Sequence, residues 1–238
     1  MRSIEGVVFD LDATLVNLGG FVDWKDAHRR VKEVYLECGC SEDFVERCSR
    51  KGLFNMLDDV WEALCKSLPQ DLSEEIQGRA YAVLTSCERE GIERCHLMPG
   101  CNEALNWLRR RGVKMGVVTS NSQDVANRIL EIKGLREYFG AVVGRTPGFR
   151  MKPHPDQLIA CFEMLECEPG RGAVIGDSVR DVEAAKSVGA YAIAVPSFFT
   201  ERAALEMAGV DLIIDCLDKI PDVFSSATLR LKESKLDP

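Results

Sequence analysis

Short apolar runs and longer amphipathic segments alternate along most of the chain. The first run, Val7-Val8-Phe9, ends at an aspartate, as a buried parallel strand would. From Pro99 onward, similar runs lie at 113–118, 141–143, 173–175, 190–195 and 212–214, separated by segments with helical periodicity. Strands that alternate with helices indicate a parallel, doubly wound sheet. The expected fold class is therefore α/β, with a Rossmann-like core.

A different pattern fills the stretch from Phe21 to about Ile92. Segments 26–38, 55–68 and 73–89 are long, charged and roughly 3.6-periodic, which predicts a small all-helical unit inserted after the first strand. Gly and Pro residues at 18–20 and 97–100 punctuate both crossings, as hinges would. We expect a catalytic core of residues 1–18 and 96–224, a helical cap at 19–95, and a polar, fraying tail at 225–238.

Composition and charge narrow the classes of partner. The chain has 238 residues, and its 46% hydrophobic and 29% charged residues are typical of an ordinary globular protein. Thirty Lys and Arg against 38 Asp and Glu give a formal charge of −8, which disfavours general nucleic-acid binding but leaves room for a local cationic pocket. No apolar run approaches the ~20 residues of a membrane span, and the first residues lack a signal-peptide layout. We expect a cytoplasmic protein with neither membrane nor nucleic-acid partners, and its oligomeric state stays open.

The chain contains ten cysteines, and no two of them form a C-x-x-C pair. Zinc and iron–sulfur sites usually show ligands paired at such spacing, and Cys38-Gly39-Cys40 alone is weak evidence for one. We interpret the cysteines as reduced thiols that are mostly buried and act as small hydrophobes. A disulfide within residues 38–101 is the alternative that the sequence leaves open.

Polar and acidic residues follow the predicted strands. In open α/β sheets, ligands bind outside the carboxyl ends of the strands, so side chains at these positions can meet. Clustered carboxylates repel one another unless a cation compensates them, and a few carboxylate oxygens completed by water suit Mg²⁺. A lysine in the same place indicates an anionic ligand. The residues concerned are Asp10, Asp12, Thr119, Ser120, Asn121, Lys152, Asp177 and Asp181.

At these residues the sequence resembles the haloacid dehalogenase-like hydrolase superfamily, specifically its helical-capped phosphatases of the phosphoglycolate phosphatase and beta-phosphoglucomutase-like branch. Four signatures appear in order. They are D-x-D-x-T at 10–14, a strand ending in Thr119, Lys152-Pro153, and G-D-x-x-x-D at 176–181. The match covers 10–16 and 99 to about 215, and the insert at about 19–95 is similar to the family's helical cap.

The resemblance implies a Mg²⁺-dependent phosphatase that acts on a small phosphorylated metabolite. Asp10 would be the nucleophile that forms an aspartyl-phosphate, and Asp12 would be general acid and then general base. The magnesium ligands would be Asp10, the main-chain carbonyl of Asp12, Asp177 and, through water, Asp181. The phosphate-binding residues would be Thr119, Ser120, Asn121 and Lys152.

Three positions also have structural interpretations or depart from the family. Ser178 and Asp181 satisfy a capping-box pattern, so Asp181 could chiefly cap its helix. His154 is interpreted as a loop residue or peripheral contact, because the carboxylate mechanism requires no histidine. Ala13 stands where these phosphatases most often have Gly; if the loop needs a positive φ there, Ala costs about 1 kcal/mol over Gly.

The cap sequence bears on the substrate only weakly. Arg47, Arg50 and Lys51 cluster in a loop between predicted helices and could hold a second anionic group, for instance the carboxylate of phosphoglycolate. A solvated charged face is the alternative interpretation. Trp24 and Trp61 are interpreted as cap core.

Hydrolysis of a small phosphomonoester, phosphoglycolate among the candidates, is the function these features favour. Phosphoglucomutase-like phosphoryl transfer is one alternative, and a catalytically silent regulatory protein on the same fold is another. Dehalogenation is disfavoured, because the dehalogenases of this superfamily lack an Asp at the position of Asp12.

Overall fold

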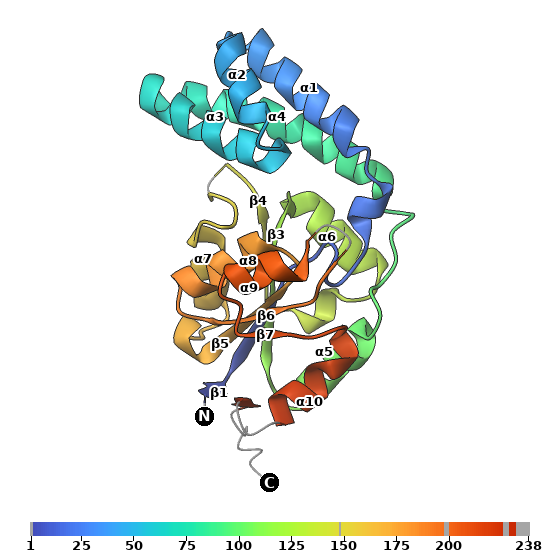
Figure 1. Cartoon of the computed structure of the whole chain (residues 1–238). Coiled ribbons are helices and arrows are strands. Elements are labelled where there is room, and N and C mark those ends of the chain that lie inside the picture. Colours follow the sequence, from blue (N-terminus) through green and yellow to red (C-terminus); the bar gives the residue numbers. More distant parts are fainter. Residues whose placement is uncertain (1, 148, 198–199, 226–228, 232–238) are drawn as a thin grey trace.

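A six-stranded parallel sheet forms the centre of the core (Figure 1). This computed structural model describes residues 2–147, 149–197, 200–225 and 229–231. The strand order is β4-β3-β2-β5-β6-β7, and every predicted apolar run overlaps one strand. The strands are β2 (Gly6–Phe9), β3 (Lys114–Ser122), β4 (Ala141–Arg145), β5 (Gly172–Gly176), β6 (Tyr191–Ala194) and β7 (Leu212–Ile213).

Helices cover both faces of this sheet, because its central strands are apolar on both sides. On β2, Val7 and Phe9 belong to one hydrophobic cluster and Val8 to another. The first cluster includes α5 (Cys101–Arg109), α6 (Gln123–Ile132) and α10 (Ile220–Ser225). The second includes α7 (Asp156–Met164), α8 (Val179–Ser187) and α9 (Arg202–Met207). The predicted doubly wound core is confirmed.

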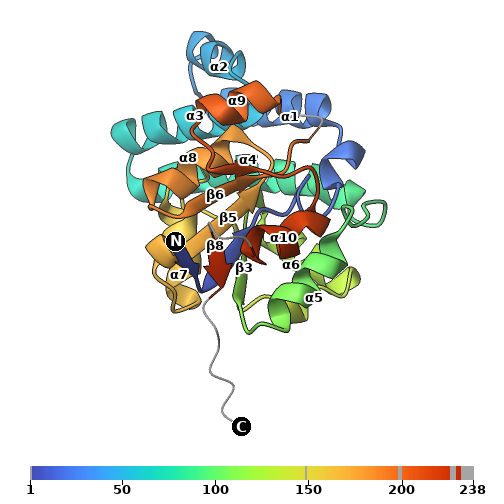
Figure 2. The same cartoon turned by 60° about the horizontal axis from the view of Figure 1, so that its bottom comes forward.

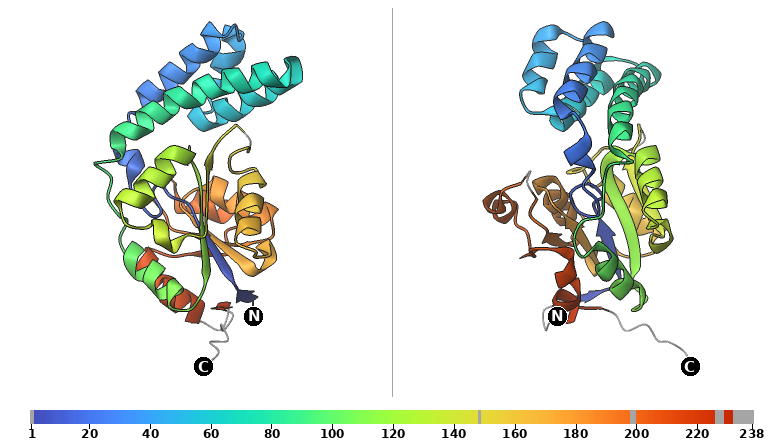
Figure 3. Two further views of the ribbon diagram at one scale, coloured as in Figure 1. Left: turned by 180° about the vertical axis from the view of Figure 1, so that it is seen from behind. Right: turned by 90° about the vertical axis from the view of Figure 1, so that its right-hand side faces the viewer.

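The inserted segment is all-helical among its described elements and lies over the carboxyl edge of the sheet (Figures 1 and 3). Its α-helices are α1 (Trp24–Glu37), α2 (Glu42–Ser49), α3 (Leu53–Ser67) and α4 (Gln70–Gly91), and a 3-10 turn, η1 (Leu18–Phe21), precedes them. Helix α1 packs against α4, and α2 against α3. Helix α4 also contacts β3 and α6, so the cap rests on the core through this helix.

The two crossings between core and cap lie side by side. Asn17 N–H donates to the carbonyl of His96, and Met98 N–H donates to the carbonyl of Leu15. Gly91 packs so closely on Leu18 that an added Cβ would lie 2.8 Å from Leu18 Cδ1. These hydrogen bonds hold the two linkers next to each other. The domain boundaries at residues 19 and 95 stay predictions.

The expectation of a fraying tail is wrong for part of the C-terminus. Leu229–Leu231 form β8, which pairs in parallel with β1 (Arg2–Ile4) in a separate two-stranded sheet (Figure 2). The burial of Leu229 and Ile4 explains why this polar segment is ordered. Positions 226–228 and 232–238 of the predicted tail lie outside the described residues.

All ten cysteines are free, and six of them are buried, which agrees with their interpretation as small hydrophobes. In the described part of the chain, no helix combines the length and the apolar character that crossing a membrane requires.

Candidate active site

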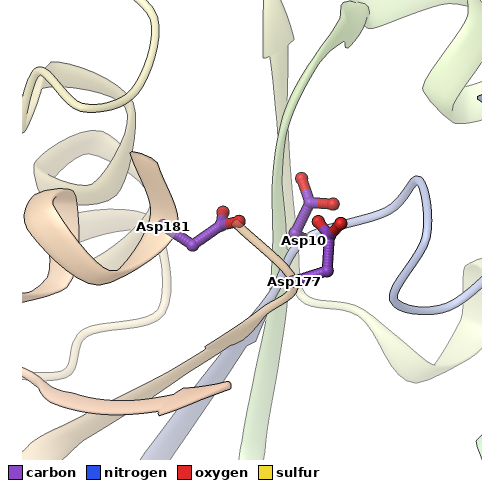
Figure 4. A group of neighbouring side chains, drawn as sticks. All are labelled: Asp10, Asp177 and Asp181. Carbon is purple, nitrogen blue, oxygen red and sulfur yellow. The ribbon is translucent and has the colours of Figure 1, made fainter. Parts of the chain in front are cut away.

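Three buried carboxylates meet at the carboxyl edge of the sheet (Figure 4). Strands β2 and β5 pair in register, with Phe9 opposite Ile175, so Asp10 and Asp177 emerge at the same edge. Asp181 reaches the same point from the first turn of α8. One carboxylate oxygen from each of Asp10, Asp177 and Asp181 lies within 4.8 Å of the others.

Lys152 joins this cluster from the loop before α7. Its Nζ donates to Asp10 Oδ1 at 2.6 Å, to Asp181 Oδ1 at 2.5 Å and to the carbonyl of Val118 at 2.9 Å. Burial by itself would lower the pKa of Lys152, but the Asp10 and Asp181 carboxylates raise it above its ordinary value. The lysine therefore keeps its positive charge although its side chain is buried.

One ammonium does not compensate three acids. Burial raises the pKa of Asp10 well above its ordinary value, and Lys152 only partly opposes this. Burial, with the Asp181 carboxylate adding to it, raises the pKa of Asp177 to about 7. Carboxylates that repel one another in a buried place, with hard oxygen donors, fit a divalent cation such as Mg²⁺. The donor set found here thus fits a divalent metal ion.

Asp12 lies beside this triad and is held by the cap linker. Its Oδ1 accepts from Gly19 N–H at 2.8 Å, and the carbonyl of Gly19 accepts from Trp24 Nε1 at 2.9 Å. Burial raises the pKa of Asp12 to about 6. A proton therefore resides on this carboxyl nearer to neutral pH than on an exposed aspartate, which suits an acid–base group.

The loop after Asp10 places Ala13 in the left-handed backbone region, as considered from the sequence. Ala13 has φ +61°, and its N–H donates to the carbonyl of Val16 at 2.7 Å. The left-handed region costs a non-glycine residue about 1 kcal/mol or more. The loop thus forms with Ala in place of Gly and retains strain at this one residue.

Strand β3 extends through the predicted phosphate-binding residues instead of ending before them. Thr119 Oγ1 donates to Asn121 Oδ1 at 3.0 Å and accepts from Asn121 N–H at 3.1 Å. Helix α6 begins at Gln123, after these residues, with the side chain of Ser122 accepting from Val125 N–H. Thr119, Ser120 and Asn121 nevertheless face the same cavity as the acids.

A cavity of about 430 Å³ lies between this edge of the core and the cap, within the range of small-molecule sites. The cap contributes Trp24 and Phe54, whose ring centroids are 5.9 Å apart. Trp24, interpreted from sequence as cap core, therefore lines the cavity, whereas Trp61 does not border it. The residues that border it are Asp10, Asp12, Ala13, Trp24, Phe54, Thr119, Ser120, Asn121, Lys152, Asp177, Ser178, Arg180, Asp181 and Thr200.

Among the lining residues that could not be named from sequence, which include Phe54 and Thr200, Arg180 is the charged one. It precedes Asp181 on α8 and donates from Nη1 to Asn55 Oδ1 at 2.9 Å and from Nη2 to Asp58 Oδ2 at 2.7 Å, both on α3. Its position inside the G-D-x-x-x-D motif was the sequence signal that could have placed it near the site. Its contact with the cap depends on how α3 lies over α8, which no local pattern shows.

The cap cations proposed from sequence lie elsewhere. Arg47, Arg50 and Lys51 are exposed, and none of them borders the cavity. Lys51 pairs with Asp59 at 2.7 Å, and the guanidinium of Arg47 lies over the ring of Phe44. These three cations near the end of α2 are therefore exposed to solvent, and none of them lies beside the acid cluster.

Two further sequence interpretations concern Asp181 and His154. The capping box is present, with the side chain of Ser178 accepting from Asp181 N–H and Asp181 Oδ2 accepting from Ser178 N–H. Asp181 therefore caps its helix with one oxygen while the other contacts Lys152. His154 does not border the cavity; its nearest acidic partner is Asp156, 3.9 Å away.

Comparison with known proteins agrees with this geometry. A model of the haloacid dehalogenase-like hydrolase family matches residues 7–195. Phosphoglycolate phosphatase 1 of Pseudomonas aeruginosa is 28% identical over 235 residues, which cover 98% of this chain and 84% of the relative. A solved structure from Thermotoga maritima, whose description suggests a beta-phosphoglucomutase, is 28% identical with a TM-score of 0.63 and covers 94% of this chain and all of its own.

The fold is also found at lower identity. A hydrolase from Pseudomonas syringae superimposes with a TM-score of 0.67 at 21% identity, over 93% of this chain and 99% of its own. Together these matches confirm the resemblance predicted from the four motifs and the predicted pairing of a Rossmann-like core with a helical cap.

Proposed function

The chain belongs to the haloacid dehalogenase-like hydrolase family, and from that premise we propose that it hydrolyses a small organic phosphomonoester through an aspartyl-phosphate on Asp10. The observation that carries this proposal is the meeting of three carboxylates and Lys152 at one end of the cavity between core and cap. A phosphate needs a nucleophile, positive charge and an exit for the leaving group, and this arrangement offers residues for each.

In the proposed first step, a carboxylate oxygen of Asp10 attacks the phosphorus in line with the bond to the leaving alkoxide. That bond breaks, an acyl phosphate forms on Asp10, and the leaving oxygen takes the proton of Asp12. In the second step, water attacks the same phosphorus while Asp12 accepts its proton, which releases inorganic phosphate and restores the Asp10 carboxylate. The pairing of Asp12 with Gly19 orients it for both transfers.

The metal in this proposal is Mg²⁺, and Asp10, Asp177 and Asp181 would hold it, Asp181 directly or through water, together with the main-chain carbonyl of Asp12. When bound, such an ion supplies positive charge that offsets the repulsion between the phosphate and the nucleophile. Lys152 adds a cation of the protein itself, in direct contact with the Asp10 carboxylate. Thr119, Ser120 and Asn121 are proposed to bind phosphoryl oxygens, since they border the cavity next to the acids.

Phosphoglycolate is the proposed substrate, supported by the name of the relative described above and by the small size of the cavity. Trp24 and Phe54 of the cap border the cavity, and closure of the cap onto the core would exclude water during the first step. The free cysteines support a reducing, cytoplasmic setting, which we propose as the location.

The test is an assay of phosphate release from p-nitrophenyl phosphate, phosphoglycolate and a hexose phosphate, with Mg²⁺ and with a chelator. We expect magnesium-dependent release from the first two, and its loss in Asp10→Asn. Isomerisation of the hexose phosphate without net phosphate release would instead establish the mutase alternative. Equal rates for the wild type and Asp10→Asn would refute the assignment of the nucleophile.

A further inference from the structure

The charges around the cavity are unevenly distributed between its two ends. Of the described residues that border the cavity, two are cations, Lys152 and Arg180. Lys152 is already held by Asp10 and Asp181 at the phosphate end. Arg180 is therefore the cation available to a second anionic group on a substrate whose phosphate lies at the acid cluster.

Arg180 stands on the core but faces the cap across the cavity. Its Nη1 and Nη2 donate to Asn55 and Asp58 of α3, and its guanidinium lies 5.9 Å from the ring centroid of Phe54. The Arg180 Nε atom is buried without a hydrogen-bond partner. A guanidinium has five N–H donors, so the two hydrogen bonds to α3 leave Arg180 with donors that can bind a further acceptor.

The partner of Arg180 in this structure is exchangeable. Asp58 contacts it through a single oxygen, not through the two-oxygen fork that binds guanidinium groups most tightly. Burial raises the pKa of Asp58 although Arg180 opposes this, so Asp58 pays a desolvation penalty to stay ionised here. Because Asp58 and Asn55 belong to the cap, opening of the hinge would also withdraw them from Arg180.

We propose that Arg180 determines substrate specificity by binding a carboxylate on the leaving group of the phosphomonoester, in place of Asp58. This inference rests on the proposed phosphatase activity and narrows its substrate class to short phosphorylated acids. It also assigns the recognition of the second anion to Arg180 on the core helix α8, which carries Asp181, and not to the cap cations Arg47, Arg50 and Lys51.

The experiment compares two substrates that differ only at the leaving group. Phosphoglycolate carries a carboxylate, whereas 2-hydroxyethyl phosphate has a neutral hydroxymethyl group in its place. For Arg180→Gln we expect kcat/KM on phosphoglycolate to fall by about 10- to 100-fold, the value of a charge-assisted hydrogen bond. On 2-hydroxyethyl phosphate we expect a change of less than about threefold, which also shows that the variant is folded.

Two control variants separate specificity from a simple cap latch. Asp58→Asn removes the charge that competes for Arg180, so we expect its preference for phosphoglycolate to be kept or raised. If Arg180 served only to hold the cap closed, Arg180→Gln and Asp58→Asn would impair both substrates alike, and the inference would be wrong. Lys51→Gln removes an exposed cap cation, and we expect it to leave kcat/KM unchanged on both substrates.

Failure of this inference is distinguishable from failure of the proposed function. A wild type that releases phosphate from p-nitrophenyl phosphate but does not prefer phosphoglycolate over 2-hydroxyethyl phosphate retains the phosphatase assignment and overturns the role of Arg180. A wild type that releases phosphate from none of the three substrates with Mg²⁺ overturns the proposed function and, with it, this inference.

Discussion

Glu88 of the cap helix α4 and Arg145 at the end of strand β4 form an ion pair whose two side chains are both fully buried. The contact is bidentate, with Nη1–Oε1 at 2.8 Å and Nη2–Oε2 at 3.0 Å. Arg145 also donates to the carbonyl of Ser120, and Glu88 accepts from Asn121 Nδ2 and Ser122 N–H. The pair thus ties the cap to the strand extension that carries the proposed phosphate-binding residues.

Breaking this pair is expected to destabilise the fold strongly. Glu88→Gln leaves the Arg145 guanidinium buried without a counter-charge, and the loss of one partner of a buried pair costs about 3–5 kcal/mol. We expect a loss of this size in the free energy of unfolding measured with urea. Because the same carboxylate accepts from Asn121 and Ser122, inorganic phosphate should also inhibit the variant more weakly.

The neighbouring residue on α4 provides the matched control. Arg89 pairs with Asp124 of α6 at 2.7 Å, also between cap and core, but both side chains are more than half exposed. Exposed pairs contribute about 0–1 kcal/mol, so Asp124→Asn should change stability by no more than that. Similar losses in Glu88→Gln and Asp124→Asn would contradict the burial argument.

Removal of one acid from the triad is expected to have opposite effects with and without metal. Without Mg²⁺, Asp177→Asn relieves repulsion among three carboxylates within 4.8 Å, so the variant should unfold at a higher temperature than the wild type. Millimolar Mg²⁺ should raise the unfolding temperature of the wild type, since binding to the native state stabilises it. The variant should lose most of that increase.

A charge change far from the triad is the control for this melting experiment. Glu62→Gln also removes one negative charge, but Glu62 is exposed on α3 and pairs with Lys66. We expect its response to Mg²⁺ to match that of the wild type. A wild type whose unfolding temperature does not respond to Mg²⁺ would contradict the assignment of a metal site.

Ala13 provides a test of backbone strain. In Ala13→Gly, relief of the positive φ offsets the greater flexibility that Gly gives the unfolded chain, so the free energy of unfolding should change by less than about 1 kcal/mol. Ala126, buried in α6, is the matched site with ordinary helical geometry, and Ala126→Gly should cost about 1 kcal/mol or more. Equal losses at the two positions in urea unfolding would show that φ at Ala13 is not strained.

Local patterns predicted the sheet and the meeting of most candidate site residues, because each feature is encoded within a few residues. Apolar runs mark the strands, and Asp10 and Asp177 follow two of them directly. The parallel pairing of neighbouring strands then brings those acids together without further information. The three-residue strands β1 and β8 lack a run long enough to recognise.

Features that depend on how distant elements pack were not predictable in this way. Glu88 and Arg145 are 57 residues apart, and neither stands in a motif. The contacts of Arg180 with Asn55 and Asp58 depend on the position of α3 above α8. The sequence pattern also could not show that Arg47 and Lys51 face away from the acids, because helical periodicity over so few residues does not tell which side the rest of the cap covers.

Two adjacent glycines in the linker to the cap, Gly19 and Gly20, differ in how closely they approach Asp12. A Cβ at Gly19 would lie 2.7 Å from Asp12 Oδ2, whereas a Cβ at Gly20 would meet nothing within 4 Å. Gly19→Ala should therefore displace the carboxylate proposed to protonate the leaving group, and Gly20→Ala should not. Since general acid catalysis contributes about 10²–10⁴-fold, we expect Gly19→Ala to lower kcat/KM on phosphoglycolate by at least about tenfold.

An aryl phosphate whose leaving group needs no proton should be much less affected, because kcat/KM reports only the steps through cleavage of the ester bond. Equal losses on both substrates would mean that the substitution disturbs the cavity as a whole, and a loss in Gly20→Ala as large as in Gly19→Ala would place the effect in the hinge instead of at Asp12.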